Sequence, residues 1–333
     1  EECGVLPGLT VVGRRHTAER RLVTGRDAGR PLVSVVIPLF NGGPWVHEAL
    51  SSVAKQTHTV HECIVVDDGS TDEGPDIVRD VQRGGSLPLT LLEIEHAGVS
   101  VARNTGIGAA SGHFIALLDS DDVWNEKKLE YQLKTIERTK AVVCTTRYAL
   151  FDSGTRRVRA VVGPRRSDRA IRRWLAMEGN GLAISSTALF PRSDIRSVEH
   201  FDQRVSAGED LGFALGMESA GEVVIDSRIL VGVRNHSAQA HRRLETVSES
   251  MAMLYDFLPI EKFGLSFARR CRANLDAHVG YSLLVRGHLV EAFGRLVDAL
   301  QKDPRRLVTL PVHAIARRLV RRSRAWFGKV RSW

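Results

Sequence analysis

Acidic residues gather at one point of the chain, in the segment ALLDSDDVW. Directly after an apolar run it carries three carboxylates in four residues, Asp119, Asp121 and Asp122. Residues i and i+2 of an extended segment point to the same side, so Asp119 and Asp121 should project together. A divalent ion such as Mg²⁺ or Mn²⁺ takes such oxygen ligands and leaves positions for phosphate oxygens. The segment therefore predicts a metal site for an anionic substrate, the alternative being an acidic loop that caps the next helix.

Two further polar loops hold candidate ligands. The first, VVDDGSTD, has Asp67 and Asp68, whose carboxylates could accept from a nucleobase N–H or a ribose hydroxyl. The alternative is that Asp68 only begins a turn and that Asp72 only caps a helix. The second, AGVSVARNTG, has Arg103, whose guanidinium suits a phosphate, and Asn104, which could hold neighbouring loops.

These loops should lie at the ends of parallel strands. Short β-branched runs alternate with helical stretches from residue 31 onward, which is typical of parallel βαβ units. We predict strands over residues 33–39, 63–67, 89–94 and 114–118, and helices over residues 45–55, 75–83 and 99–110. Ligands of an open parallel sheet bind outside the carboxyl ends of its strands, so the loops should line one crevice.

The pattern is less regular in the second half. We predict a polar helix over residues 127–140, strands over 141–151 and 158–162, a helix over 168–177, an extended segment over 187–190, a helix over 211–220, and two last strands over 223–225 and 230–233. From residue 242 onward only helices are expected. One of them, over residues 287–304, either resembles a single helix of a tetratricopeptide unit or is an ordinary packing helix.

Composition and charge exclude several classes of protein. The chain has 333 residues, 43% of them hydrophobic, and a net charge of +8, so it can bury a large core. Basic residues crowd both ends, whereas acidic clusters lie in the middle, where the crevice is expected. A nucleic-acid binder needs a basic binding face, whereas the expected crevice is acidic. A dinucleotide-dependent oxidoreductase needs the motif GxGxxG after the first strand, where this chain has NGGP. Neither class fits.

The sequence also favours a cytoplasmic protein. No apolar stretch approaches the roughly 20 residues of a membrane-spanning helix, and the start of the chain carries no sign of export. The four cysteines have no CxxC spacing, and Cys63 and Cys144 lie in apolar runs that suit a core. Residues 310–333 mix apolar side chains with arginines, which suits either an interfacial helix on the inner face of an anionic membrane or a solvated basic end.

Several motifs in register resemble those of one known family. The segments PLFNG, VVDDGSTD, AGVSVARNTGI, SGHFIALLDSDDVW and KLE follow one another between Pro31 and Glu130, as in the inverting glycosyltransferases of family 2. The resemblance implies an α/β fold of the GT-A (Rossmann-like) type, with a mostly parallel central sheet flanked by helices and a helical C-terminal extension. We expect a basic arm over residues 1–30, a transferase domain over 31–240, with its donor half at about 31–125 and its acceptor half at about 126–240, and a helical, basic region over 241–333.

The resemblance also implies roles for individual residues. Residues expected to bind the donor are Pro38, Phe40, Asn41, Asp67, Asp68, Arg103 and Ser120. The family often has Tyr where Phe40 stands, so a hydroxyl contact would be absent. Asp119 and Asp121 correspond to the DxD-type motif, with His236 as a further candidate metal ligand.

On the acceptor side, Glu209 and Asp210 resemble the ED motif, in which Asp210 would be the catalytic base. Ser185 and Ser186 fall in the region where the family lines its acceptor pocket. The alternative for Glu209 and Asp210 is that they are acidic residues favoured at a helix N-terminus.

The function implied is inverting transfer of a sugar from a nucleotide diphosphate donor, most often UDP in this family, to an acceptor hydroxyl. Mg²⁺ or Mn²⁺ would offset charge on the leaving diphosphate while a carboxylate takes the acceptor proton. A glycan or lipid-linked acceptor in cell-surface polysaccharide or glycolipid synthesis would fit. The alternative is a catalytically silent relative that binds nucleotide sugars.

Overall fold

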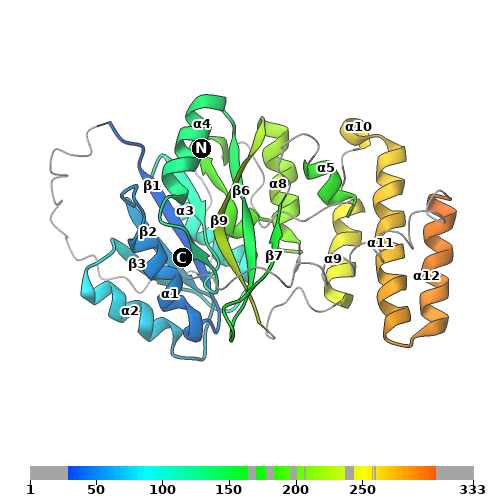
Figure 1. Ribbon diagram of the computed structural model, residues 1–333, viewed down its shortest axis with the longest axis horizontal. Helices are drawn as coiled ribbons and strands as arrows, with labels where there is room; N and C mark the ends of the chain where they lie inside the picture. The colour runs from blue at the N-terminus through cyan, green and yellow to red at the C-terminus, as the bar shows by residue number, and fades with distance from the viewer. Residues whose placement is uncertain are drawn as a thin grey trace, which may run out of the picture.

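One sheet organises the molecule. The computed structural model describes residues 29–163, 170–177, 184–195, 201–205, 208–236, 244–256, 258 and 260–304. Its nine-stranded sheet has the order β3-β2-β1-β4-β8-β6-β9-β5, and β7 pairs with β6. Helices flank the sheet, and a group of C-terminal helices lies beyond one end of it (Figure 1). The α/β fold with a helical extension is thus confirmed.

The first part of the sheet is parallel, with short connections. Strands β1 (Val33–Leu39), β2 (Glu62–Asp67), β3 (Leu89–Glu93) and β4 (Phe114–Leu117) alternate with helices α1 (Gly43–Ala54), α2 (Gly74–Gly84) and α3 (Val99–Ala109). Each element was predicted to within two residues. Strand β1 is buried along its whole length because helices cover both faces of the sheet, which is why its sequence is almost continuously apolar.

The second part of the sheet contains mixed pairings. Strands β6 (Val143–Asp152) and β9 (Val223–Asn235) run parallel, whereas β7 (Val158–Val162) and β8 (Leu189–Pro191) pair antiparallel with β6. The prediction of two last strands is wrong, since β9 is continuous. The polar residues in the middle of β9 resembled a break between two strands. Asp226 is nevertheless buried there and accepts a hydrogen bond from Arg228 (2.6 Å). The segment 187–190 is also corrected, because Thr187 ends helix α6 (Ile184–Thr187) and the strand begins at Leu189.

A two-residue strand, β5 (Val123–Trp124), was not predicted. It pairs antiparallel with β9, Val123 opposite Gly232. Because Asp121 precedes this pair and Arg234 follows it, the pairing brings the acidic segment to the end of β9. Trp124 packs in the core, 1% exposed, and its Nε1 donates to the Ser186 carbonyl at 2.8 Å.

The remaining helices complete the two halves. They are α4 (Lys128–Thr139), α5 (Ala170–Leu175), α7 (Arg192–Ile195), α8 (Glu209–Ala220), α9 (Leu244–Asp256), α10 (Ile260–Phe263), α11 (Leu265–Val285) and α12 (Leu289–Lys302). Residues 168 and 169 of the predicted helix 168–177 lie outside the described residues. The predicted helix 287–304 is α12, which packs along α11 (Figure 1). No helix in the described ranges is both long enough and apolar enough to span a membrane.

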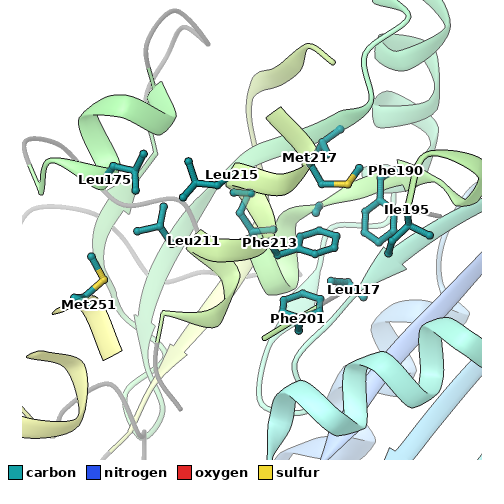
Figure 2. Packing of buried hydrophobic residues seen from close by; sticks show 14 of the residues in the cluster. Leu117, Leu175, Phe190, Ile195, Phe201, Leu211, Phe213, Leu215, Met217 and Met251 are labelled. Carbon is teal, nitrogen blue, oxygen red and sulfur yellow. The ribbon is translucent and has the colours of Figure 1, made fainter. Parts of the chain in front are cut away.

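Helix α8 lies deep in the core. Figure 2 shows side chains from several of its faces, Leu211, Phe213, Leu215 and Met217, packed among residues of β4, β8, α5 and α9. The Phe213 ring stacks on that of Phe201, with centroids 4.4 Å apart. Contacts on several sides fix the position of α8, and therefore that of the two carboxylates at its first turn. Cys63 and Cys144 are buried as expected.

Two glycines of α3 test how closely this helix packs on the sheet. A Cβ at Gly106 would lie 2.4 Å from Val36 Cγ1 and 3.2 Å from Val66 Cγ2, whereas a Cβ at Gly108 meets nothing within 4 Å. Gly106→Ala should lower the free energy of unfolding by about 1–3 kcal/mol through overpacking. Gly108→Ala should leave it unchanged or raise it by up to about 1 kcal/mol, because alanine favours helix. Urea unfolding of both variants measures the difference, and equal effects would contradict the packing.

Candidate functional site

The first two loops of the crevice are tied together by Asn41. Its Oδ1 accepts from the Thr71 N–H at 2.8 Å, and its own N–H donates to Ser70 Oγ at 2.9 Å. Asn41 has φ +49°, a left-handed conformation that asparagine tolerates better than most residues. Pro38 lies buried in β1, and the Asp67 carboxylate accepts from the Ser70 N–H at 3.2 Å. The loop after β1 and the loop after β2 thus form one unit.

Asp72 has a structural place, as its alternative interpretation held. Its two carboxylate oxygens accept from the Gly43 N–H at 2.8 Å and the Gly74 N–H at 2.9 Å. These two N–H groups belong to the first residues of α1 and α2. Asp72 therefore joins the first residues of both helices, and this structural role accounts for both of its carboxylate oxygens.

Asp68 and Phe40 bring the third loop to the crevice. The buried Asp68 carboxylate accepts from the N–H groups of Ala97 (2.7 Å) and Gly98 (2.9 Å). His96, next to these residues, stacks on the half-exposed Phe40 ring with centroids 4.2 Å apart. The pair offers an aromatic surface between the loop after β1 and the loop before α3. Sequence reasoning missed His96, for which only its position beside the AGVS motif gave a signal.

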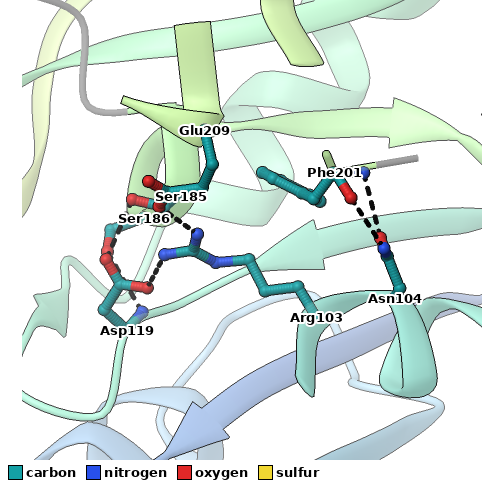
Figure 3. A network of polar contacts seen from close by, with 7 residues as sticks. All are labelled: Arg103, Asn104, Asp119, Ser185, Ser186, Phe201 and Glu209. Carbon is teal, nitrogen blue, oxygen red and sulfur yellow. Dashed lines mark hydrogen bonds and ion pairs between the residues drawn. The ribbon is translucent and has the colours of Figure 1, made fainter. Parts of the chain in front are cut away.

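Arg103 connects the two halves of the molecule, as Figure 3 shows. Its Nη2 donates to Asp119 Oδ1 at 2.7 Å, and its Nη1 donates to Glu209 Oε1 at 2.6 Å. Arg103 is 3% exposed, and its guanidinium carbon lies 5.1 Å from the centre of the Phe201 ring. Burial opposes its charge, but the two carboxylates raise the pKa of Arg103, so it stays charged. Arg103, which was expected to bind a phosphate, is therefore already paired with two protein carboxylates.

Neighbouring polar groups strengthen this connection (Figure 3). Asn104 donates to the Phe201 carbonyl at 2.9 Å and accepts from the Phe201 N–H at 3.0 Å, which confirms that it holds a neighbouring segment. Ser185 Oγ donates to Asp119 Oδ2 at 2.9 Å, and the Asp119 N–H donates to Ser186 Oγ at 3.1 Å. The two serines expected on the acceptor side thus contact the first aspartate of the acidic segment.

Asp121 and His236 form a second pair at the crevice. Asp121 Oδ2 and His236 Nε2 lie 2.8 Å apart, and the imidazole packs on the Trp45 ring with centroids 4.0 Å apart. His236 Nδ1 is buried without a hydrogen-bond partner in the described part of the chain. A carboxylate oxygen and an imidazole nitrogen at this separation fit a divalent cation. No group of three or more His, Cys, Asp or Glu converges for a metal among the described residues.

The other members of the acidic segment have different surroundings. Asp122 is 3% exposed and accepts from Ser186 Oγ at 2.6 Å and from the Arg234 N–H at 3.0 Å. Burial, then the charges of Asp121 and Asp119, raise the pKa of Asp122. Ser120 lies against the first loop, since a Cβ at Gly42 would be 2.8 Å from its Oγ. Asp119 and Asp121, expected to face one cation together, are paired in this structure with Arg103 and His236 respectively.

Asp210 follows Glu209, a partner of Arg103, in the first turn of α8. Burial, then the charge of Glu209, raises the pKa of Asp210 to about 8, although Arg103 opposes the shift. A carboxylate with a raised pKa is a stronger base near neutral pH. Sequence reasoning missed Tyr148 of β6: burial, then the charges of Asp210 and Asp122, raise the pKa of its phenol. A lone tyrosine within an apolar strand gave no signal.

Comparisons with known proteins identify the family. Residues 34–198 match the family described as Glycosyl transferase family 2. The putative teichuronic acid biosynthesis glycosyltransferase TuaG of Bacillus subtilis (strain 168) is 38% identical over 122 residues, 36% of this chain and 48% of that protein. The uncharacterized glycosyltransferase RP339 of Rickettsia prowazekii (strain Madrid E) is 29% identical over 212 residues, 63% of this chain and 65% of that protein. The matched segment spans less than two thirds of either relative.

Solved structures share the fold. S. aureus TarS 1-349 in complex with UDP-GlcNAc aligns with a TM-score of 0.60 at 20% identity, covering 84% of this chain and 83% of that one. The mannosyltransferase PcManGT from Pyrobaculum calidifontis in complex with GDP-Man and Mn²⁺ aligns with a TM-score of 0.55 at 20% identity, covering 86% of both chains. The fold is that of the GT-A glycosyltransferases, with carboxylates at the carboxyl ends of its strands. Within that class, the chain belongs to glycosyltransferase family 2.

Removing the Arg103 guanidinium should be far more damaging than removing an exposed one. Arg103→Met leaves Asp119 and Glu209 without their shared partner, so the free energy of unfolding should fall by about 3–5 kcal/mol. Arg79 is a matched control, because it also pairs with two carboxylates, Asp76 and Glu93, but is half-exposed. Arg79→Met should cost less than about 1 kcal/mol. Equal losses of unfolding free energy in the two variants, measured with denaturant, would show that the buried ion pairs stabilise the protein no more than the exposed ones.

Proposed function

We propose that this protein transfers a sugar from a nucleotide diphosphate donor to an acceptor hydroxyl, with inversion at the anomeric carbon. The observation that carries the proposal is the buried Arg103 bridge between Asp119 and Glu209. It joins the acidic motif after β4 to the acidic pair that begins α8. The catalytic domain would extend over residues 31–240, with residues 241–333 as a helical extension and residues 1–30 as a basic arm.

The donor would occupy the crevice at the carboxyl ends of β1, β2 and β4. Phe40 and His96 would contact the base, and the loops fixed by Asn41, Asp67 and Asp68 would hold the ribose. Pro38, Ser120 and Arg103 complete the proposed donor side. A UDP donor is proposed from the family resemblance and is supported by the UDP-GlcNAc bound to S. aureus TarS.

Asp121 and His236 would hold Mg²⁺ or Mn²⁺ at the diphosphate. When bound, such an ion offsets the charge that develops on the leaving group. The Mn²⁺ in the PcManGT complex supports a divalent ion. Asp119, two residues before Asp121, would keep the loop in place through its ion pair with Arg103. Trp45, packed on the imidazole, would keep His236 oriented.

Asp210 would accept the proton of the attacking hydroxyl, on the face opposite the leaving group. Its environment supports this role, because burial and the Glu209 charge raise its pKa toward the range of a general base. Glu209, Ser185 and Ser186 would shape the acceptor side while they hold Arg103 and Asp119 in place. Tyr148, whose phenol has a pKa raised in part by the charge of Asp210, would also lie on the acceptor side.

The acceptor would be a glycan or a lipid-linked sugar in the synthesis of a cell-surface polysaccharide or glycolipid. The similarity to TuaG, named for teichuronic acid biosynthesis, supports this class of acceptor. We also propose a cytoplasmic location, with a peripheral position at the inner face of an anionic membrane that would present such an acceptor. The basic composition of residues 305–333 supports that position.

The decisive experiment is a panel of UDP-, GDP- and dTDP-linked sugars tested for release of the nucleoside diphosphate. Release should occur with Mn²⁺ or Mg²⁺, stop when EDTA removes the ion, and return when the ion is restored. If one of these donors bound but was never consumed with any acceptor, the chain would be a silent nucleotide-sugar-binding relative, which is the second candidate.

Asp210→Asn should keep donor affinity within about threefold and lower the rate of transfer at least about 100-fold, since a general base contributes on that order or more. Donor affinity is measured by calorimetry and transfer by diphosphate release. Asp80→Asn on the exposed side of α2 is the control and should behave like the unmodified chain. Normal transfer by Asp210→Asn would refute its assignment as the base.

A further inference from the structure

Helix α12 carries an apolar stripe that its neighbours leave uncovered. Leu289 is 63% exposed, Val290 88% and Phe293 72%, values far above those of apolar side chains in a core. The stripe continues along the helix at spacings of three and four residues through partly exposed Val297 and Leu300. Residues at this spacing share one side of a helix, so the stripe runs over almost the whole length of α12.

A different side of α12 makes the contact with α11. Ala292 and Ala299 are buried against α11, and α12 approaches so closely at Gly280 that a Cβ there would lie 3.0 Å from Leu296. On the same side Arg295 and Lys302 pair with Asp276 of α11. The packing of α12 is therefore complete without the stripe. Figure 1 shows α12 at the end of the molecule far from β3, with its outer side unopposed by any described element.

The charge of the chain is concentrated directly after this helix. Residues 305–333 contain nine basic residues and no acidic residue, while the whole chain has a net charge of +8. The excess positive charge of the protein is thus accounted for by this one segment. It begins three residues after the last residue of α12, Lys302, so an apolar stripe and a basic segment adjoin.

We propose that the stripe on α12 inserts into the surface of an anionic membrane, with residues 305–333 providing the electrostatic attraction. An exposed apolar stripe and a polybasic segment are each weak attachments, and membrane binding becomes stable when two such signals combine. A second copy of the chain is a poorer occupant, because pairing two α12 stripes would bring two segments of nine positive charges together. Nucleic acid would attract the charges but offers no place for Val290 and Phe293.

This inference rests on the proposed function only in that a membrane would present the acceptor. It adds the surface through which the chain would attach. The candidate site residues contribute nothing to that surface, since Phe40 and His236 directly follow β1 and β9, whereas the stripe lies on α12. Failure of one proposal is therefore distinguishable from failure of the other.

The test is co-sedimentation of the full chain with vesicles of phosphatidylcholine alone or with 30% phosphatidylglycerol, about a typical anionic content. Binding should require the anionic lipid and weaken at least tenfold from 0.1 to 0.5 M salt. The double variant Val290→Glu/Phe293→Glu should bind at least tenfold more weakly. Ile260→Glu is the matched control, since Ile260 is 52% exposed but lies on α10 away from the stripe, and it should bind as the unmodified chain does.

Three results would overturn the proposal. One is unchanged vesicle binding by the double variant, and another is equal binding to vesicles without anionic lipid. The third is evidence that protein covers the stripe: a dimer in light scattering that the double variant dissociates, or a fall of several degrees in the melting temperature of the variant without vesicles. Diphosphate release from a free donor, measured on the same samples, should be unchanged in the double variant whichever way the membrane result falls.

Discussion

The site depends on one buried charge. Arg103 is only 3% exposed, so its guanidinium loses most of its hydration and is stable only where carboxylates replace that water. Arg103 finds one carboxylate on Asp119, at the end of β4, and the other on Glu209, at the start of α8. Because these residues are far apart in the sequence, the need to pair one cation twice fixes the start of α8, in the second half of the molecule, relative to the end of β4, in the first. A shift of either half would leave a buried charge without its partner.

A second set of contacts fixes the orientation of that junction. The short pairing of β5 with β9 places Arg234 beside the acidic segment, where its N–H donates to Asp122 and its Nε donates to the Asp121 carbonyl at 2.7 Å. Asp122 also accepts from Ser186, so it ties β9 and α6 to the same turn. With Arg103 on one side and Arg234 on the other, the turn that carries Asp121 is held in place before any ligand binds.

Local chemistry explains which parts could be predicted from the sequence. The parallel half follows from runs of β-branched residues that end in polar loops, so its strands and the candidate residues Asp68, Arg103 and Asp119 could be named in advance. What the sequence could not show is which polar groups satisfy each other across 100 residues, as with Arg103 and Glu209. Strand β5 is too short to have a periodicity, and the buried Asp226 made a continuous β9 resemble two strands. His96 and Tyr148 matter only through neighbours that the fold supplies.

The charges of the crevice bear on what it would hold. Five carboxyl groups lie in this region, those of Asp119, Asp121, Asp122, Glu209 and Asp210. The two arginines beside them are already paired with protein carboxylates: Arg103 pairs with Asp119 and Glu209, and Arg234 pairs with Glu48. A diphosphate would therefore enter a region whose positive charge is already matched by protein. A divalent cation between Asp121 and His236 would change that balance, because it would add two positive charges next to the leaving group while leaving the Arg103 bridge intact. In this arrangement the arginines hold the two halves of the protein together, and the recognition of the anionic donor would fall to the metal.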